Sequence, residues 1–253
     1  MTATEHRDPA AKVLAVLVFM AESDQDWGVR ELARELSLTP STCLRCLTAL
    51  IDSGLVEKDE TTKRFDLSGS ALRLAHLITN RHNIADLVRP VLAAATERSG
   101  EAAVLAVVDW RTRQSMYVAA SEAEHPLRYV LPLYEWGPVS TGASGVAALA
   151  HGPADQVDEV VAAVATRDRA EVRRGIEHVR EEGFVSTHSR RIPGAVGVAA
   201  PVFGPEGVAR GSITLTIPES RFDEGRIRTL AEIVRDAAAA ATRLTGGRAP
   251  SSS

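Results

Sequence analysis

The stretch from Gly28 to Lys58 reads GVRELARELSLTPSTCLRCLTALIDSGLVEK and decides the fold of the first part of the chain. Its first half predicts a short helix, because apolar residues recur at the i, i+3, i+4, i+7 spacing of one helix face. That stripe consists of Val29, Leu32, Ala33 and Leu36. A second helix begins at Thr39-Pro40, carries the same spacing and ends at Gly54, where a left-handed residue is favoured. Its inward stripe consists of Cys43, Cys46, Leu47 and Leu50. The short connection between the two helices predicts a helix-turn-helix.

The flanking segments complete a small domain. Residues 9–21 read as another helix, with Asp8 as the N-cap candidate before Pro9. Downstream, residues 55–58 and 64–67 flank a polar run, which predicts a short β-hairpin. Three helices and a hairpin predict a winged helix-turn-helix over residues 1–67. Residues 68–83 then predict a linker helix between two domains.

Length and composition limit the class of protein. A chain of 253 residues is long enough for two domains of roughly 100–200 residues each. The 45% hydrophobic and 25% charged residues are typical of a globular protein and exclude a disordered or collagenous chain. The net charge of −4 excludes a polycation, so any nucleic-acid contact must be local. Cys43 and Cys46 alone give no disulfide framework and fit a reducing cytoplasm.

No stretch is apolar for the roughly 18 residues that a membrane span needs. The apolar run at residues 13–21 resembles a short signal-peptide core. Glu5 and Asp8 precede it, however, so the segment lacks a clearly positive start. A buried helix is the favoured interpretation, and we expect a cytoplasmic protein with no membrane partner.

The second part of the chain mixes helices and strands. Residues 84–246 predict one domain of an α+β protein, and the Gly-, Pro- and Ser-rich tail at 247–253 predicts disorder. Strands are expected at 102–108, 116–120, 127–133, 184–187, 196–203 and 211–217. Helices are expected at 84–98, 144–150, 155–166, 169–182 and 222–244.

The exposed face of the second helix of the helix-turn-helix fits a DNA contact. If its cysteines and leucines face inward, the outward residues are Ser41, Thr42, Arg45 and Thr48. Hydroxyls at a helix N-terminus suit phosphate, and an arginine one turn on could reach a guanine edge. Lys58, Lys63 and Arg64 on the hairpin could hold the flanking backbone. The alternative is that these residues are simply solvated.

This domain carries less positive charge than is usual for a DNA-binding domain. Residues 1–82 hold ten Lys or Arg against twelve Asp or Glu. Modest affinity per domain is therefore expected, and two or more domains must act together.

The Cys43-Leu-Arg-Cys46 spacing has three possible meanings. A zinc site needs four ligands as a rule, and no further cysteine or nearby histidine lies in this segment. A thiol sensor stays open as an alternative. Both positions match the inward stripe, so small core residues are the favoured interpretation.

Both halves of the chain resemble the IclR family of bacterial transcription regulators. The Gly28–Lys58 stretch and the strand at residues 64–68, RFDLS, resemble the family's DNA-binding domain. Residues 138–150, PVSTGASGVAALA, resemble its P-L-H-x-T-A-x-G-K-A-x-L-A segment. Gly183-Phe184, Pro193-Gly194 and the VAAPV run at 198–202 resemble its later signature. The likeness runs from about residue 9 to residue 245.

This resemblance implies a dimer or tetramer whose winged helices bind a palindrome-like operator. It also implies a GAF-like C-terminal domain over 84–246 that serves oligomerisation and binds a small organic or aromatic acid, with no cofactor. The effector-binding residues implied are Ala143, Ser144, Gly145, His188, Gly197, Thr214 and Thr216. From the residues themselves, the N–H groups at the start of the Ser144 helix suit a carboxylate, and Thr214 and Thr216 share a strand face with Ser212.

One segment departs from the family pattern. Where the family often has S-D-G-E, this chain has Thr187-His188-Ser189-Arg190, followed by Arg191. The local charge turns positive, which favours an anionic effector, and Arg190→Ala is expected to weaken acid binding. The alternative is that both arginines lie on a solvated loop.

Two other classes of protein fit the sequence less well. The sequence has no G-x-S-x-G, H-E-x-x-H or Walker motif, so an enzyme is not expected. A sensor whose winged helix mediates protein contacts stays as the alternative. The polar face at Ser41 and Arg45 favours DNA, since it has no evident use in an apolar interface.

Overall fold

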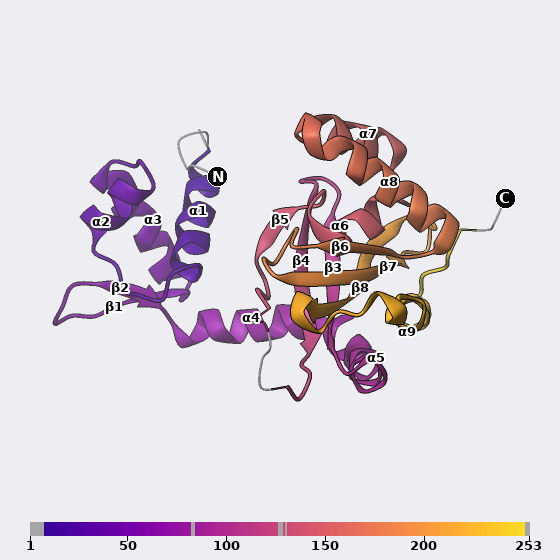
Figure 1. Cartoon of the computed structure of the whole chain (residues 1–253). Coiled ribbons are helices and arrows are strands. Elements are labelled where there is room, and N and C mark those ends of the chain that lie inside the picture. Colours follow the sequence, from indigo (N-terminus) through magenta and orange to yellow (C-terminus); the bar gives the residue numbers. More distant parts are fainter. Residues whose placement is uncertain (1–7, 82–83, 126–128, 130, 251–253) are drawn as a thin grey trace. The chain divides into compact units, whose positions relative to one another are not determined.

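The computed structural model describes residues 8–81, 84–125, 129 and 131–250. The chain divides into two compact units, Met1–Asn83 and Ile84–Ser253. Figure 1 labels their helices and strands.

The first unit is a winged helix-turn-helix followed by one more helix. Its elements are α1 (Pro9–Ala21), α2 (Val29–Glu35), α3 (Pro40–Asp52), β1 (Val56–Lys58), β2 (Phe65–Leu67) and α4 (Gly69–Arg81). Asp8 caps α1, as predicted, by accepting a hydrogen bond from the Ala10 amide at 3.0 Å. Gly54 follows α3 with φ +76°, a left-handed conformation that glycine adopts without strain.

One apolar cluster holds the first unit together. It buries the inward stripes of α2 and α3, where Leu32, Leu47 and Cys43 are fully inaccessible. Phe65 of the hairpin joins the same cluster and pairs with Trp27 in an isolated β-bridge. The hairpin is therefore anchored to the segment that precedes α2.

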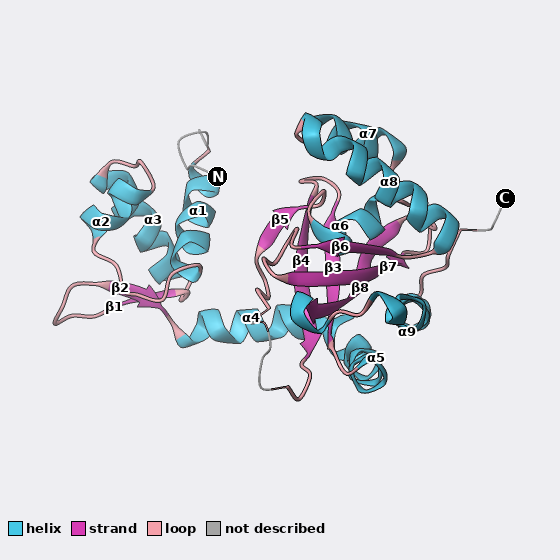
Figure 2. Ribbon diagram, in the orientation of Figure 1, coloured by secondary structure: helices cyan, strands magenta, loops and turns pink. Residues whose placement is uncertain are grey.

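The second unit is a six-stranded antiparallel sheet with helices on both faces (Figure 2). The strand order is β5-β4-β3-β8-β7-β6. The strands are β3 (Ala102–Asp109), β4 (Gln114–Ser121), β5 (Trp136–Pro138), β6 (Val185–His188), β7 (Ala195–Phe203) and β8 (Ala209–Pro218). The helices are α5 (Ile84–Ser99), α6 (Gly142–Leu149), α7 (Ala154–Ala163), α8 (Thr166–Glu182) and α9 (Ile227–Leu244), with short 3₁₀ turns η2 (Glu219–Arg221) and η3 (Glu224–Arg226) before α9.

The sheet has two different faces. On one face Ile213, Leu215 and Ile217 of β8 pack with α5 and α9 in the largest apolar cluster. The alternate residues of β8 point to the other face, which α6, α7 and α8 cover (Figure 2). Those residues are hydroxyl-bearing, so the fold places a polar row beneath α6.

The architecture confirms the predicted fold class, an α+β chain with an N-terminal winged helix-turn-helix. The strand expected at 127–133 lies partly outside the described residues, which leave out 126–128 and 130, and the short strand β5 lies at Trp136–Pro138. One local prediction differs. The tail was expected to be disordered from residue 247. The described part of it packs, because the Arg248 amide donates to the Gly204 carbonyl at 3.2 Å and Arg248 Nε to that of Pro205 at 2.9 Å.

Among the described residues, no helix has both the length and the hydrophobicity needed to cross a membrane.

Candidate functional sites

The first candidate site is the outward face of α3. Thr39 caps this helix by accepting from the Thr42 amide at 3.2 Å, and Pro40 occupies its first turn. Cys43 and Cys46 face the core, as predicted, so Ser41, Arg45 and Thr48 are exposed. The structure therefore places the four predicted α3 residues on one surface, with Thr42 half-buried at its edge.

Hydrogen bonds within the helix occupy most of the hydroxyls on this surface. Thr39 Oγ1 lies 3.2 Å from Ser41 Oγ and 2.9 Å from Thr42 Oγ1. Thr48 Oγ1 donates to the Leu44 carbonyl at 2.9 Å. Arg45 has no hydrogen-bond or ion-pair partner among the residues that the structure describes. Its guanidinium is the group on this face that is free to meet a ligand.

Arg64 of the hairpin, which is predicted to contact the DNA backbone, has two carboxylate partners within the unit. Its Nε lies 2.8 Å from Asp26 Oδ1 and its Nη2 lies 2.8 Å from Glu31 Oε2. The hydrogen bond from Arg64 lowers the pKa of Glu31. Arg64 therefore ties the wing to α2, and its charge is balanced within the unit.

The lysines of the wing share one carboxylate. Glu60 accepts from Lys63 Nζ at 2.7 Å and from Lys58 Nζ at 3.0 Å, and these contacts lower its pKa to about 2. Both lysines are partly exposed and can exchange this partner for a phosphate, since exposed ion pairs are weak.

The two cysteines are buried free thiols. Burial raises the pKa of Cys43 to about 11 and raises that of Cys46 as well. A thiol with such a pKa carries little thiolate at neutral pH, and the thiolate is the reactive form. The described residues also contain no group of three or more potential metal ligands. These observations favour the role of small core residues.

The second candidate site lies beneath α6 in the C-terminal unit. Ala143 on α6 faces Gly197 on β7 and Thr214 on β8, because a Cβ on Gly197 would lie 3.1 Å from the Cβ of Ala143 and 3.6 Å from Thr214 Cγ2. Thr216 is the strand partner of Gly197. The structure thus brings these four predicted residues together.

Three hydroxyls in this region are buried without hydrogen-bond partners. They belong to Ser144, Thr214 and Ser212, whose exposed fractions are 1%, 2% and 0%. Ser212 was seen on this strand face in the sequence but was not named as a site residue. Buried hydroxyls without a protein partner are uncommon, so each of these three is a candidate to bind a ligand or a water molecule.

The other two predicted residues have different surroundings. His188 was expected in the same pocket, but its ring packs edge-on against Phe222 with centroids 5.4 Å apart, on the face that carries α5 and α9. Strand alternation explains this, because Val185 of the same strand packs in the α6–α8 cluster. Gly145 has a packing role, since a Cβ there would lie 1.9 Å from the carbonyl oxygen of Val139.

Because of this contact, we predict that Gly145→Ala lowers the stability of the protein. The added methyl collides with backbone that cannot rotate away, so we expect about 1–3 kcal/mol lower free energy of unfolding. Urea denaturation followed by circular dichroism measures the loss. Gly69→Ala is the matched control, because a Cβ there meets nothing within 4 Å. An unchanged midpoint for Gly145→Ala would contradict the close packing of α6.

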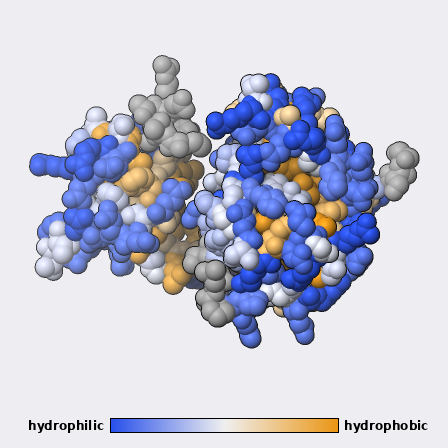
Figure 3. All heavy atoms as spheres, viewed as in Figure 1, coloured by the Kyte–Doolittle hydropathy of each residue, from blue (hydrophilic) through white to orange (hydrophobic). Residues whose placement is uncertain are grey.

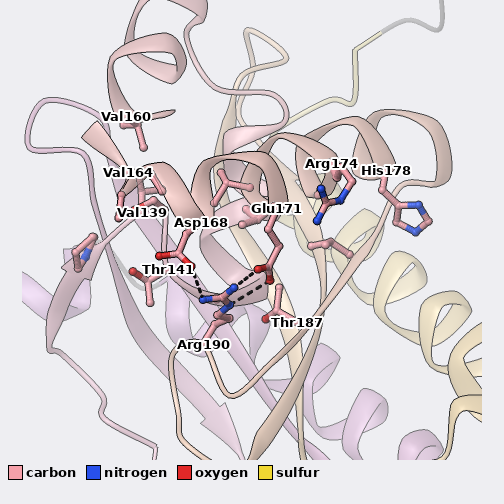
Figure 4. A pocket seen from close by; sticks show the side chains of 18 of the residues that line it. Val139, Thr141, Val160, Val164, Asp168, Glu171, Arg174, His178, Thr187 and Arg190 are labelled. Atoms are coloured by element: carbon pink, nitrogen blue, oxygen red, sulfur yellow. Dashed lines mark hydrogen bonds and ion pairs between the residues drawn. The ribbon is translucent and has the colours of Figure 1, made fainter. Parts of the chain in front are cut away.

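The two arginines after β6 differ in their surroundings. Arg190 lies 3.1 Å from Asp168 Oδ1 and also pairs with Glu171, so two carboxylates of α8 balance its charge (Figure 4). Arg191 lies over the Tyr117 ring at 4.3 Å, and its Nη1 donates to Ser115 Oγ at 2.9 Å. It has no carboxylate partner among the described residues. Neither side chain is simply solvated.

Tyr117 links Arg191 to the hydroxyl cluster. Burial raises the pKa of its phenol, and nearby Arg191 and Ser144 oppose this rise. Ser144 is therefore close to the phenol, although its Oγ has no hydrogen bond of acceptable geometry. An unpaired cation and three unpartnered hydroxyls thus gather on one side of the sheet.

A cavity of about 980 Å³ opens beside this cluster (Figure 4). It runs between the start of α6, the helices α7 and α8, and strand β6, and its lining combines valines with charged residues of both signs. None of the seven predicted effector residues lines it. Thr187 does, and its Oγ1 lies 3.9 Å from the position of a Cβ on Gly197, so the cavity adjoins the hydroxyl cluster. Sequence reasoning missed the cavity because α7 and α8 carry no motif that marks it.

The winged helix-turn-helix fold is typical of one class of protein, the DNA-binding regulators. Comparison with known proteins gives the family. The model of the IclR helix-turn-helix domain matches residues 9–60, and that of the bacterial transcriptional regulator IclR C-terminal domain matches residues 76–243. The chain belongs to the IclR family of bacterial transcriptional regulators.

Individual relatives agree with this assignment. The HTH-type transcriptional regulator BhcR of Paracoccus denitrificans is 26% identical over 87% of this chain and 80% of its own length. A putative IclR transcriptional regulator from Silicibacter superposes with a TM-score of 0.80 at 26% identity, covering 96% of this chain and 98% of that one. An IclR homologue from Microbacterium hydrocarbonoxydans, solved with 4-hydroxybenzoate, superposes with a TM-score of 0.75 at 20% identity over 92% and 98% of the chains. The relatives are transcriptional regulators and not enzymes, in agreement with the sequence prediction.

Proposed function

We propose that this chain is an effector-controlled regulator that inserts α3 into the major groove of a palindrome-like operator. The unpartnered Arg45 on the exposed side of α3 is the observation that carries the proposal. An arginine in this place is suited to the O6 and N7 acceptors of guanine. Ser41 and Thr42 lie at the N-terminus of the helix, where they fit a phosphate.

A single winged helix offers little net positive charge to DNA. Arg64 and Lys63 are both paired with carboxylates, and the unit already holds more acids than bases. Tight binding then requires two units on one operator. We therefore propose that the chain acts as a homodimer or a homotetramer.

Helix α4 supplies a surface for a second copy. Leu74, Leu77 and Ile78 form one stripe on α4 with exposed fractions of 42%, 44% and 55%. Figure 3, coloured by the hydropathy of each residue, shows hydrophobic residues in orange on the visible surface of both units. Tight DNA binding requires a second winged helix. We therefore propose that this stripe packs against the same stripe of another copy of the chain.

The effector in this proposal is an organic anion bound between Arg191, the hydroxyl cluster and the adjoining cavity. A half-buried cation without a carboxylate partner is costly unless an anion meets it. The hydroxyls of Ser144 and Thr214 then gain the partners they lack. The 4-hydroxybenzoate complex of a homologue supports this class of ligand.

Calorimetric titration with 4-hydroxybenzoate and benzoate tests this site. Arg191→Ala is expected to weaken acid binding about ten- to hundred-fold, the value of a charged hydrogen bond. Arg111→Ala is the matched control and should bind as the wild type does, since its side chain is 85% exposed and lies outside the cavity. Equal losses in both variants would contradict the proposed role of Arg191. If no aromatic or aliphatic acid binds, the anionic effector itself is wrong.

The effector acts on DNA binding only if it binds two arrangements of the dimer unequally. We propose that helix α4, which links the two units in the chain, transmits the effect of effector binding to the winged helices. A sensor whose winged helix contacts another protein is the alternative function, and the DNA-binding measurement below separates the two.

A further inference from the structure

The DNA-facing surface of α3 presents two side chains that no internal contact uses. The hydroxyls of Ser41, Thr42 and Thr48 take part in hydrogen bonds within the helix. Arg45 has no partner, and beside it lies Leu44, which is 48% exposed. Any reading of sequence by this helix must depend strongly on these two neighbours.

Leu44 has no structural role that explains its exposure. It does not belong to the apolar cluster of the first unit, nor to the partly buried residues packed against that cluster. Its neighbours one turn away on the same face, Ser41 and Thr48, are polar. It lies in the N-terminal half of α3, the part of a recognition helix that contacts base edges.

We propose that Leu44 reads a thymine in each operator half-site by packing against its 5-methyl group, next to the base pair that Arg45 contacts. Thymine is the base whose major-groove edge carries a methyl group, and apolar side chains are its usual partners. The methyl and the leucine leave water together, which favours thymine over every other base at that position. The inference rests on the proposed function, since it requires α3 in the major groove.

Replacing thymidine with deoxyuridine tests the contact between Leu44 and the thymine methyl group, because it removes that methyl alone. Operator duplexes are first selected from random sequence with the full-length protein. Each thymine of the selected half-site is then replaced in turn by uracil, which removes the methyl and keeps the base pair. Binding of each duplex is measured by fluorescence anisotropy for the wild type, Leu44→Ala and Ile51→Ala.

We expect one thymine position per half-site at which uracil weakens wild-type binding about four-fold, the value of one buried methyl or methylene group. Replacement in both half-sites should weaken it about fifteen-fold. Leu44→Ala should bind the thymine and uracil duplexes equally. Ile51→Ala should keep the discrimination, because Ile51 is exposed on the same helix but near its C-terminal end. Leu44 is exposed, so its truncation leaves the fold intact, which circular dichroism verifies.

The outcomes separate this inference from the proposed function. If selected DNA binds tightly but no thymine discriminates, or if Leu44→Ala still discriminates, Leu44 does not read thymine while the DNA-binding function stands. If no sequence is enriched and all duplexes bind as weakly as competitor, both proposals fail.

Discussion

Arg45→Ala is expected to abolish specific DNA binding at working concentrations. A bidentate arginine–guanine contact is worth about 1–3 kcal/mol, and a two-fold operator contains two of them. Affinity for the operator should therefore fall about ten- to hundred-fold for each half-site. The stability of the protein should not change, because Arg45 is exposed and has no partner among the described residues.

Two variants separate base reading from simple charge. Arg45→Lys keeps the charge but loses the planar fork, so it should lose specificity while it keeps affinity for unrelated DNA. Arg73→Ala removes an exposed arginine from α4 and should have a much smaller effect. Anisotropy titrations against operator and unrelated duplexes measure all three. If Arg45→Lys and the wild type were equally specific, Arg45 would contact phosphate and not a base.

A second large effect is expected when charge is placed on the α4 stripe. Leu74→Glu combined with Ile78→Glu puts carboxylates where we propose that a second copy packs. The dimer should dissociate, and affinity for a two-fold operator should fall about 10²–10⁴-fold, the usual contribution of a second linked binding unit. Sedimentation velocity and anisotropy measured on the same sample report both changes.

Leu72→Glu is the matched control for this substitution. Leu72 is 75% exposed and lies on the other side of the same helix from Leu74 and Ile78. It should remain dimeric and bind the operator as the wild type does. A double variant that stays dimeric would show that the copies associate through another surface.

The first unit was predictable from sequence because its signals are local. The stripe that holds Cys43 and Cys46 follows helical periodicity, and Gly54 stops α3 through its own conformational preference. The partner of Arg64 was not predictable. Glu31 lies 33 positions away in the sequence, and only the folded hairpin brings the two side chains together.

The C-terminal site was predictable in part. Alternation along β8 was sufficient to place Thr214 and Thr216 on one face with Ser212. The same rule places His188 on the opposite face from Val185, but the register of β6 against β7 decides which face that is. The strand at residues 136–138 carries only three residues, too few for a periodic signal. The tail after Gly246 packs through backbone hydrogen bonds, which composition does not reveal.

Binding of the full-length protein to the DNA upstream of its own gene tests the central claim most directly. Fluorescence anisotropy is measured with unrelated DNA as competitor and across a salt series. Tight binding that survives competitor, weakens as salt rises and is lost in Arg45→Ala is the result expected of a regulator that reads DNA through α3. The claim that α3 reads DNA would be contradicted if selected and upstream sequences bound no better than competitor, or if specific binding were unchanged in Arg45→Ala.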